Sequence, residues 1–147
     1  MLDSRLVRVV VDTNVVFEGL THLGSAAEVI DAWVARRFQP CISTALALEY
    51  QGVLERKLSP VRGESVLMAL QALLVRCEYV PIYYSYRPSS PDPGDDLVVD
   101  CVLNSRAVLL TNNVKDFSGP SRTLGFRIFQ PAEFMRYLNN PGQLELS

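Results

Sequence analysis

The chain has 147 residues, of which 48% are hydrophobic and 20% are charged, so it can fill one core and is too short for two ordinary domains. This composition excludes a disordered chain, and no apolar run approaches the roughly 20 residues of a membrane span. The net charge of −2 argues against high-affinity binding to duplex nucleic acid. We expect a single domain over residues 1–147, without a signal peptide, soluble in the cytoplasm and not associated with a membrane.

Strand and helix patterns alternate along the chain. In chain order, the sequence predicts a buried strand over residues 6–11, a helix over 25–38, a short strand over 41–42, and helices over 43–56 and 66–76. An edge piece over 79–84, a loop over 87–95, a helix over 95–105, strands over 108–110 and 126–129, and a helix from Pro131 complete the order. Ser25 and Glu28 have the spacing of a capping box, and Ser43 is expected to cap the following helix. The alternation predicts an α/β three-layer sandwich with a central, mostly parallel sheet.

Acidic and polar residues follow two of the predicted strands. The carboxyl ends of parallel strands meet at one edge of the sheet, where ligands bind. Asp12 directly follows the first strand and is expected at that edge, either as a ligand or as the N-cap of the next helix. Thr111, Asn113 and Asp116 follow the strand at 108–110, either near a metal-bound water or as ordinary turn residues.

Glu49 is expected to point toward the same edge. It shares one helix face with Leu46 and Val53, which are typical core residues, so its carboxylate lies inward or at the rim. A carboxylate in that position needs compensation, because burial of an unpaired charge is costly. The alternatives are a bound metal ion and an ion pair with an arginine.

The densest acidic cluster comprises Asp92, Asp95, Asp96 and Asp100. Asp95 and Asp96 begin a predicted helix, where the helix dipole favours negative charge, but this effect does not account for four acids within nine residues. Asp95 is expected to project toward the sheet. Asp96 and Asp100, one turn apart, are expected on a more exposed face.

Acids that converge from distant segments repel one another and raise each other's pKa unless a cation neutralises them. Carboxylate oxygens suit Mg²⁺ or Mn²⁺, and two such ions about 4 Å apart can activate water and stabilise the leaving oxygen of a phosphodiester. His22 is the only histidine, so a histidine-rich metal site is excluded. The three cysteines lack CxxC spacing and are expected to be buried thiols.

Six segments of the sequence resemble those of PIN-domain nucleases, most closely the bacterial branch of VapC-like toxins from toxin–antitoxin pairs. The segments are VVVDTNVVFEGL (9–20), GSAAEVIDAWVARRF (24–38), ISTALALEYQGVLERKLS (42–59), DPGDDLVVD (92–100), LLTNNVKDF (109–117) and GFRIFQPAEF (125–134). They cover nearly the whole chain in the order found in the family. The resemblance implies a PIN-like fold and a metal-dependent ribonuclease that uses Mg²⁺ or Mn²⁺.

The resemblance also assigns roles to individual residues. It implies that Asp12, Glu49 and Asp95 are the catalytic, metal-binding acids, with Asp96 as the other candidate for the third position. The residues in the second rank are Asn14, Thr111, Asn113 and Asp116. Many members have a fourth acid where this chain has Asn113, so the site has three carboxylates or Asp116 substitutes for the fourth. The implied partners are an RNA substrate, a small inhibitory antitoxin and a second copy of the chain in a homodimer.

Three other functions compete with this interpretation. A haloacid-dehalogenase-like phosphatase needs a second Asp two residues after the first, where this chain has Asn14. A receiver domain needs its acceptor Asp after a later strand and a lysine near the site, for which Lys115 is the only candidate. The alternative from another class is a catalytically weak or inactive PIN-like module that binds RNA or protein, which the Asn113 departure favours.

Overall fold

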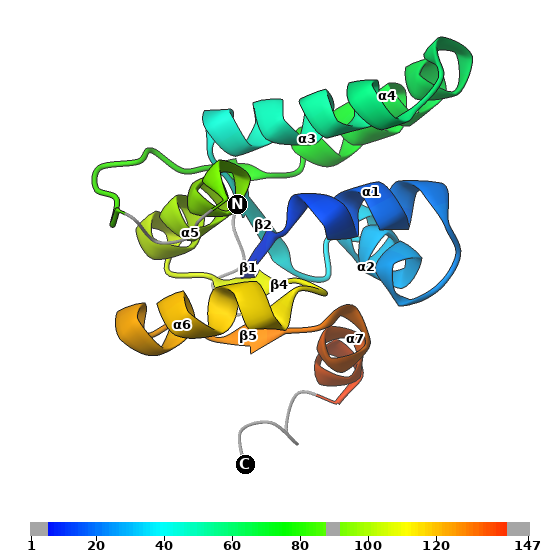
Figure 1. The fold of residues 1–147 in the computed structure, drawn as a ribbon. Coiled ribbons are helices and arrows are strands. Elements are labelled where there is room, and N and C mark those ends of the chain that lie inside the picture. The colour runs from blue at the N-terminus through cyan, green and yellow to red at the C-terminus, as the bar shows by residue number, and fades with distance from the viewer. Residues whose placement is uncertain (1–5, 88–91, 141–147) are drawn as a thin grey trace.

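The computed structural model describes residues 6–87 and 92–140, and its centre is a five-stranded parallel sheet (Figure 1). The strands are β1 (Arg8–Val11), β2 (Gln39–Ile42), β3 (Glu78–Tyr79), β4 (Val108–Leu110) and β5 (Ile128–Phe129). Their order across the sheet is β3-β2-β1-β4-β5, and all neighbouring pairs are parallel. The central strand β1 is almost fully buried from Val9 to Val11, as its run of valines predicts.

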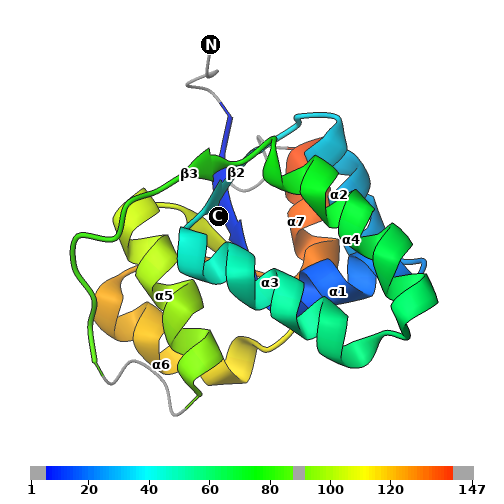
Figure 2. The same cartoon turned by 90° about the horizontal axis from the view of Figure 1, so that it is seen from above.

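Helices cover both faces of this sheet. They are α1 (Thr13–Thr21), α2 (Ser25–Val34), α3 (Thr44–Lys57), α4 (Pro60–Leu74), α5 (Pro93–Ser105), α6 (Val114–Leu124) and α7 (Pro131–Asn139). Figure 2 shows α5 and α6 on one side of the sheet and α1, α2 and α7 on the other. The predicted α/β three-layer sandwich with a parallel sheet is therefore confirmed.

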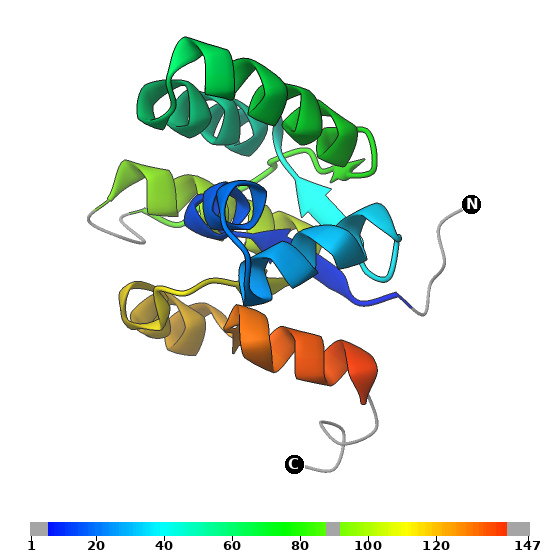
Figure 3. The same cartoon turned by 90° about the vertical axis from the view of Figure 1, so that its right-hand side faces the viewer.

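The pair α3 and α4 extends beyond the β2 and β3 end of the sheet, as the side view shows (Figure 3). Helix α3 packs against α1, α4 and α5, so it bridges the two helical layers near the end of β1. The indole N–H of Trp33, in α2, donates to the carbonyl of Leu73, in α4, at 3.0 Å. This arrangement places α3 over the edge where β1 ends.

Several local predictions differ from the structure. The N-cap of α2 is Gly24 at φ 133°, and Ser25 is the first helical residue and makes no capping hydrogen bond. The predicted cap at Ser43 is confirmed, since its hydroxyl accepts from the backbone N–H of Leu46 at 3.1 Å. The edge strand β3 has only two residues, and Pro81 follows it outside the sheet.

Within the described part of the chain, no helix combines the length and hydropathy that a membrane span requires.

Candidate active site

Asp12 lies at the carboxyl end of the central strand and is held there from two sides. Its backbone N–H donates to the carbonyl of Leu110, at the end of β4, over 2.9 Å. One carboxylate oxygen, Oδ2, accepts from the hydroxyl of Thr111 at 2.8 Å. Asp12 occupies the N-cap position of α1, yet its side chain makes no capping hydrogen bond. The side chain is therefore held by Thr111, directly after β4.

The electrostatic environment of Asp12 disfavours its charged form. Only 4% of the residue is exposed, and this burial is the main cause that raises the pKa of its carboxyl group. The Thr111 hydroxyl and the Thr13 backbone N–H oppose the shift, whereas the negative charges of Asp92 and Asp116 add to it. Two acids from other segments of the chain, Asp92 and Asp116, are thus within electrostatic reach of Asp12.

A chain of hydrogen bonds leads from Asp12 to Asp116. The Thr111 hydroxyl, which is fully buried, also accepts from the backbone N–H of Asn113 at 2.9 Å. The amide of Asn113 then donates to the carboxylate of Asp116 at 2.6 Å. Asn113 thereby holds the exposed carboxylate of Asp116 at this edge. Asn14 lies nearby in sequence, exposed in the first turn of α1.

Glu49 and Asp92 meet at the start of α5. A β-carbon built on Gly94 would lie 3.4 Å from Oε1 of Glu49 and 3.3 Å from Oδ1 of Asp92, so both carboxylates lie against this glycine. Asp92 is the N-cap of α5 and accepts from the backbone N–H of Gly94 at 2.8 Å. Glu49 also has the arginine partner considered above, since Arg56 lies 3.9 Å away, but 67% of the arginine side chain is exposed. Such a solvated pair compensates the carboxylate only weakly.

Tyr50, the residue after Glu49, ties α3 to the end of β1. Its side chain is buried, and its hydroxyl donates to the carbonyl of Val11, directly before Asp12. Burial is the main cause that raises the pKa of the phenol well above its usual range, so the hydroxyl keeps its proton. The helix that carries Glu49 is thus joined to the strand that carries Asp12 by a buried hydrogen bond.

The remaining acids of α5 divide between two environments. Asp95 is half-buried in the first turn of α5. Asp96 lies 3.8 Å from the guanidinium of Arg87, and Asp100 accepts two hydrogen bonds from the same guanidinium at 2.8 and 2.7 Å. Asp100 is only 6% exposed, so the expectation of an exposed face is wrong for this residue. The face is covered because residues 80–87 pack along α5 and bring Arg87 to it.

Comparison with known proteins identifies the family. A PIN domain family model matches residues 8–115. The chain belongs to the PIN domain family. Among solved structures, it is similar to VapBC2 from Rickettsia felis bound to a DNA fragment from their promoter, with a TM-score of 0.61 and 17% sequence identity. The match covers 84% of this chain and 98% of that chain. It is also similar to FitAB bound to IR36 DNA, at a TM-score of 0.57 and 14% identity over 84% of this chain and 94% of that one. No curated protein matches.

The PIN domain family match confirms the resemblance found in the sequence and argues against the phosphatase and receiver alternatives. The similar structures, at these low identities, establish a shared fold. The carboxyl edge of this PIN domain gathers side chains from β1, α3, α5 and the segment after β4. The sequence predicts Asp12 and Glu49 as ligand candidates but does not indicate Asp92 as one. The signal for Asp92 is its position before a Pro-Gly pair, which predicts an N-cap at the edge of the sheet.

The acids at this edge have the type of donor atom that a divalent metal ion prefers. Asp12, Glu49, Asp92 and Asp116 offer carboxylate oxygens, which hard divalent cations prefer. In their present side-chain conformations, however, no group of three or more His, Cys, Asp or Glu residues within 6–87 and 92–140 is close enough to hold an ion.

Proposed function

We propose that this PIN domain is a metal-dependent endoribonuclease that hydrolyses RNA phosphodiester bonds with Mg²⁺ or Mn²⁺. The observation that carries the proposal is the buried carboxylate of Asp12, whose pKa is raised by its burial and by the charges of Asp92 and Asp116. Acids held in such mutual repulsion are typical of sites that a cation neutralises. The family to which the chain belongs supports the nuclease activity.

The proposal assigns roles to the acids that the sequence predicts as ligands and to Thr111. Asp12, Glu49 and Asp95 would hold the ion, with Asp96 as the other candidate for the third position and Asp116 in place of the acid that Asn113 lacks. A divalent cation bound there supplies activation of water and stabilisation of the leaving oxygen. The Thr111 hydroxyl orients the carboxylate of Asp12, in the way that outer hydrogen bonds orient metal ligands.

The biological setting is proposed on the same basis. We infer that the protein is the toxin of a toxin–antitoxin pair, with a small antitoxin as partner, and that it forms a homodimer in the cytoplasm. The resemblance of its sequence to VapC-like toxins supports this inference, as does the similarity of its fold to structures of VapBC2 and FitAB. Co-expression with the product of the neighbouring gene, followed by co-purification, tests the antitoxin. Light scattering of the purified chain tests the dimer.

Cleavage of a fluorescently labelled, structured RNA tests the activity directly. The wild-type protein is expected to cleave with Mg²⁺ or Mn²⁺ and to lose cleavage when EDTA removes the metal. Asp12→Asn is expected to abolish cleavage, whereas Asp31→Asn, an exposed acid on α2, serves as the matched control and keeps it. Cleavage that persists in EDTA would exclude the metal mechanism. Cleavage that persists in Asp12→Asn would exclude the proposed site.

A second candidate function is a catalytically weak or inactive PIN-like module that binds RNA or protein. It is favoured by Asn113 at the usual position of an acid and by the open arrangement of the carboxylates in the described residues. Tight RNA binding without cleavage in either metal would select this function over the first.

A further inference from the structure

Residues 80–87, which we call the tyrosine strap, pass along the outer side of α5 (Figure 2). The side-chain amide of Asn104 accepts from the backbone N–H of Tyr83 at 2.9 Å and donates to the carbonyl of Tyr84 at 2.8 Å. The hydroxyl of Tyr84 donates to the carbonyl of Leu103 at 2.9 Å. Arg87 continues the attachment through its hydrogen bonds with Asp100. The backbone of the strap is therefore held in a defined position on α5.

The direction of the strap links the two edges of the sheet. Asn104 lies near the end of α5, Asp100 one turn earlier and Asp96 another turn earlier, and the strap contacts them in that order. It therefore runs antiparallel to α5, from the amino edge of the sheet toward the carboxyl edge. Asp92, which raises the pKa of Asp12, is at the far end of this path.

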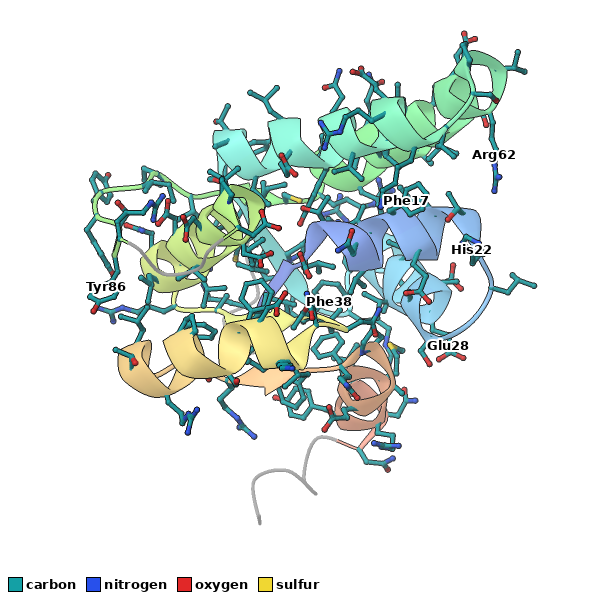
Figure 4. All side chains as sticks on the ribbon, viewed as in Figure 1. Phe17, His22, Glu28, Phe38, Arg62 and Tyr86 are labelled. Atoms are coloured by element: carbon teal, nitrogen blue, oxygen red, sulfur yellow. The ribbon has the colours of Figure 1, made fainter. Side chains whose placement is uncertain are left out.

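The strap presents aromatic side chains to solvent. Tyr83 is 84% exposed and Tyr86 is 50% exposed. Tyr86 lies at one side of the molecule, across from Arg62 at the tip of the α3–α4 pair (Figure 4). Ile82 and Tyr84 of the strap are also exposed, so the strap carries a group of large apolar side chains rather than a single one. Such a group indicates an interaction surface, whereas a single exposed ring does not. Such rings are the groups on which unpaired bases stack.

A cavity of about 400 Å³ lies beside the strap at the amino ends of β4 and β5. Tyr84, Phe126, Arg106 and Arg127 are among the residues that line it. The guanidinium of Arg127 is 5.3 Å from the centre of the Phe129 ring, which positions it without neutralising it. Among the residues that the structure describes, no carboxylate forms an ion pair with Arg106 or Arg127. Both cations are therefore available for an anionic partner.

We propose that the tyrosine strap and the two cavity arginines bind the single-stranded part of an RNA substrate and lead it to the acidic edge. Bases would stack on Tyr83 and Tyr86, and phosphates would contact Arg106 and Arg127. This inference rests on the proposed ribonuclease function, because the path ends at Asp12. The combination of exposed rings with unpaired arginines favours a nucleic acid over a protein partner, since each nucleotide supplies one flat apolar base and one phosphate.

Fluorescence anisotropy with a 5′-fluorescein-labelled, unstructured 12-nucleotide RNA tests the surface. The measurement uses the Asp12→Asn protein in EDTA, so that binding is observed without cleavage. Tyr83→Ala is expected to weaken binding at least about fivefold, the lower limit for loss of one base–aromatic stack, and Tyr83→Phe is expected to restore it. Each contact with a single-strand phosphate contributes roughly 0.7 to the slope of log K against log salt concentration. The combined Arg106→Gln and Arg127→Gln variant loses two such contacts, so its slope is expected to be shallower by about 1.4. Arg62→Gln is the matched control and leaves both quantities unchanged.

Two results would overturn this inference. The first is unchanged RNA affinity in Tyr83→Ala, Tyr86→Ala and the double arginine variant, with circular dichroism showing that each is folded. The second is conversion of a dimer to a monomer by Tyr83→Ala, which would make the strap an interface between copies of the chain. Failure of the nuclease proposal has a different signature, because RNA would then bind through the strap while the wild-type protein cleaves it in neither metal.

Discussion

Replacement of Thr111 by valine removes the hydrogen bond that orients Asp12 while it keeps the shape of the side chain. In the folded protein, the Thr111 hydroxyl is fully buried, donates to Oδ2 of Asp12 at 2.8 Å and accepts from the backbone N–H of Asn113 at 2.9 Å. A hydrogen bond to a charged group contributes about 1.5–3 kcal/mol, and one between neutral groups about 0.5–1.5 kcal/mol. Because the methyl group of valine recovers part of this loss, we expect Thr111→Val to lower the free energy of unfolding by about 2–3 kcal/mol at pH 7.5.

The loss is expected to depend on pH through Asp12. Burial raises the pKa of this carboxyl group in the folded protein, and the Thr111 hydroxyl lowers it again. A folded-state pKa above the unfolded value means that the folded protein binds the proton more tightly. The free energy of unfolding then falls as pH rises through the window between the two pKa values, and the full penalty applies above it. Removal of the Thr111 hydroxyl raises the folded-state pKa of Asp12 further, so the window between the two pKa values extends to higher pH. The loss of unfolding free energy caused by Thr111→Val therefore grows from mildly acidic to neutral pH.

Urea denaturation followed by circular dichroism at pH 5 and pH 7.5 measures both effects. In an Asp12→Asn background, both hydrogen bonds of the Thr111 hydroxyl are between neutral groups and together contribute about 1–3 kcal/mol. After the partial recovery by the valine methyl group, Thr111→Val is expected to cost about 1–2 kcal/mol there, with no difference between the two pH values. Thr21→Val is the matched control, because the Thr21 hydroxyl donates to the Phe17 carbonyl within α1. A loss of equal size in both backgrounds, independent of pH, would refute this account of the Asp12 environment.

Three further substitutions test the surroundings of the site. Glu49→Gln is expected to keep the fold and change the free energy of unfolding by less than about 1 kcal/mol, since its exposed Arg56 partner contributes little; a clear fall in thermal stability of the metal-free protein would indicate that the ion pair is structural. Gly94→Ala adds a carbon 3.3 Å from Oδ1 of Asp92 and 3.4 Å from Oε1 of Glu49. It is therefore expected to weaken Mn²⁺ binding, measured by calorimetry, with little change in melting temperature. Unchanged Mn²⁺ affinity would contradict this expectation. Gly19→Ala would bring its β-carbon to 2.6 Å from the carbonyl oxygen of Ala26. We expect this overpacking to lower the free energy of unfolding by about 1–3 kcal/mol in urea denaturation. A more stable protein would contradict the close approach of α1 and α2.

The strands and most helices were predictable because their signals are local. The valine run of β1 and the apolar residues of β4 indicate buried parallel strands, and Ser43 caps α3 as expected. Helix α6 was not predicted, because Gly119 and Pro120 are poor helix formers. Its stability comes from tertiary packing through Phe117, which is fully buried, and no local pattern reveals that contact.

The sequence predicts those site residues whose position follows from the order of the strands, and not those that depend on how helices and loops pack. The position of Asp12 after a buried strand was enough to place it at the carboxyl edge, and its partner Thr111 follows from the same rule. The pairing of Asp100 with Arg87 was not predictable, since it depends on how residues 80–87 pack on α5. The same holds for Asp92, whose cap position is readable but whose proximity to Glu49 depends on the packing of α3 against α5.

Isothermal titration of Mn²⁺ into the metal-free protein at pH 7.5 is the most direct test of the acidic edge as a cation site. We predict saturable binding in the wild-type protein and in Asp31→Asn, and an affinity at least about tenfold weaker in Asp12→Asn, because a directly bound carboxylate contributes no less than an outer hydrogen-bond partner. An absence of saturable binding, or equal affinity in Asp12→Asn, would contradict the claim that these carboxylates converge to hold a divalent cation.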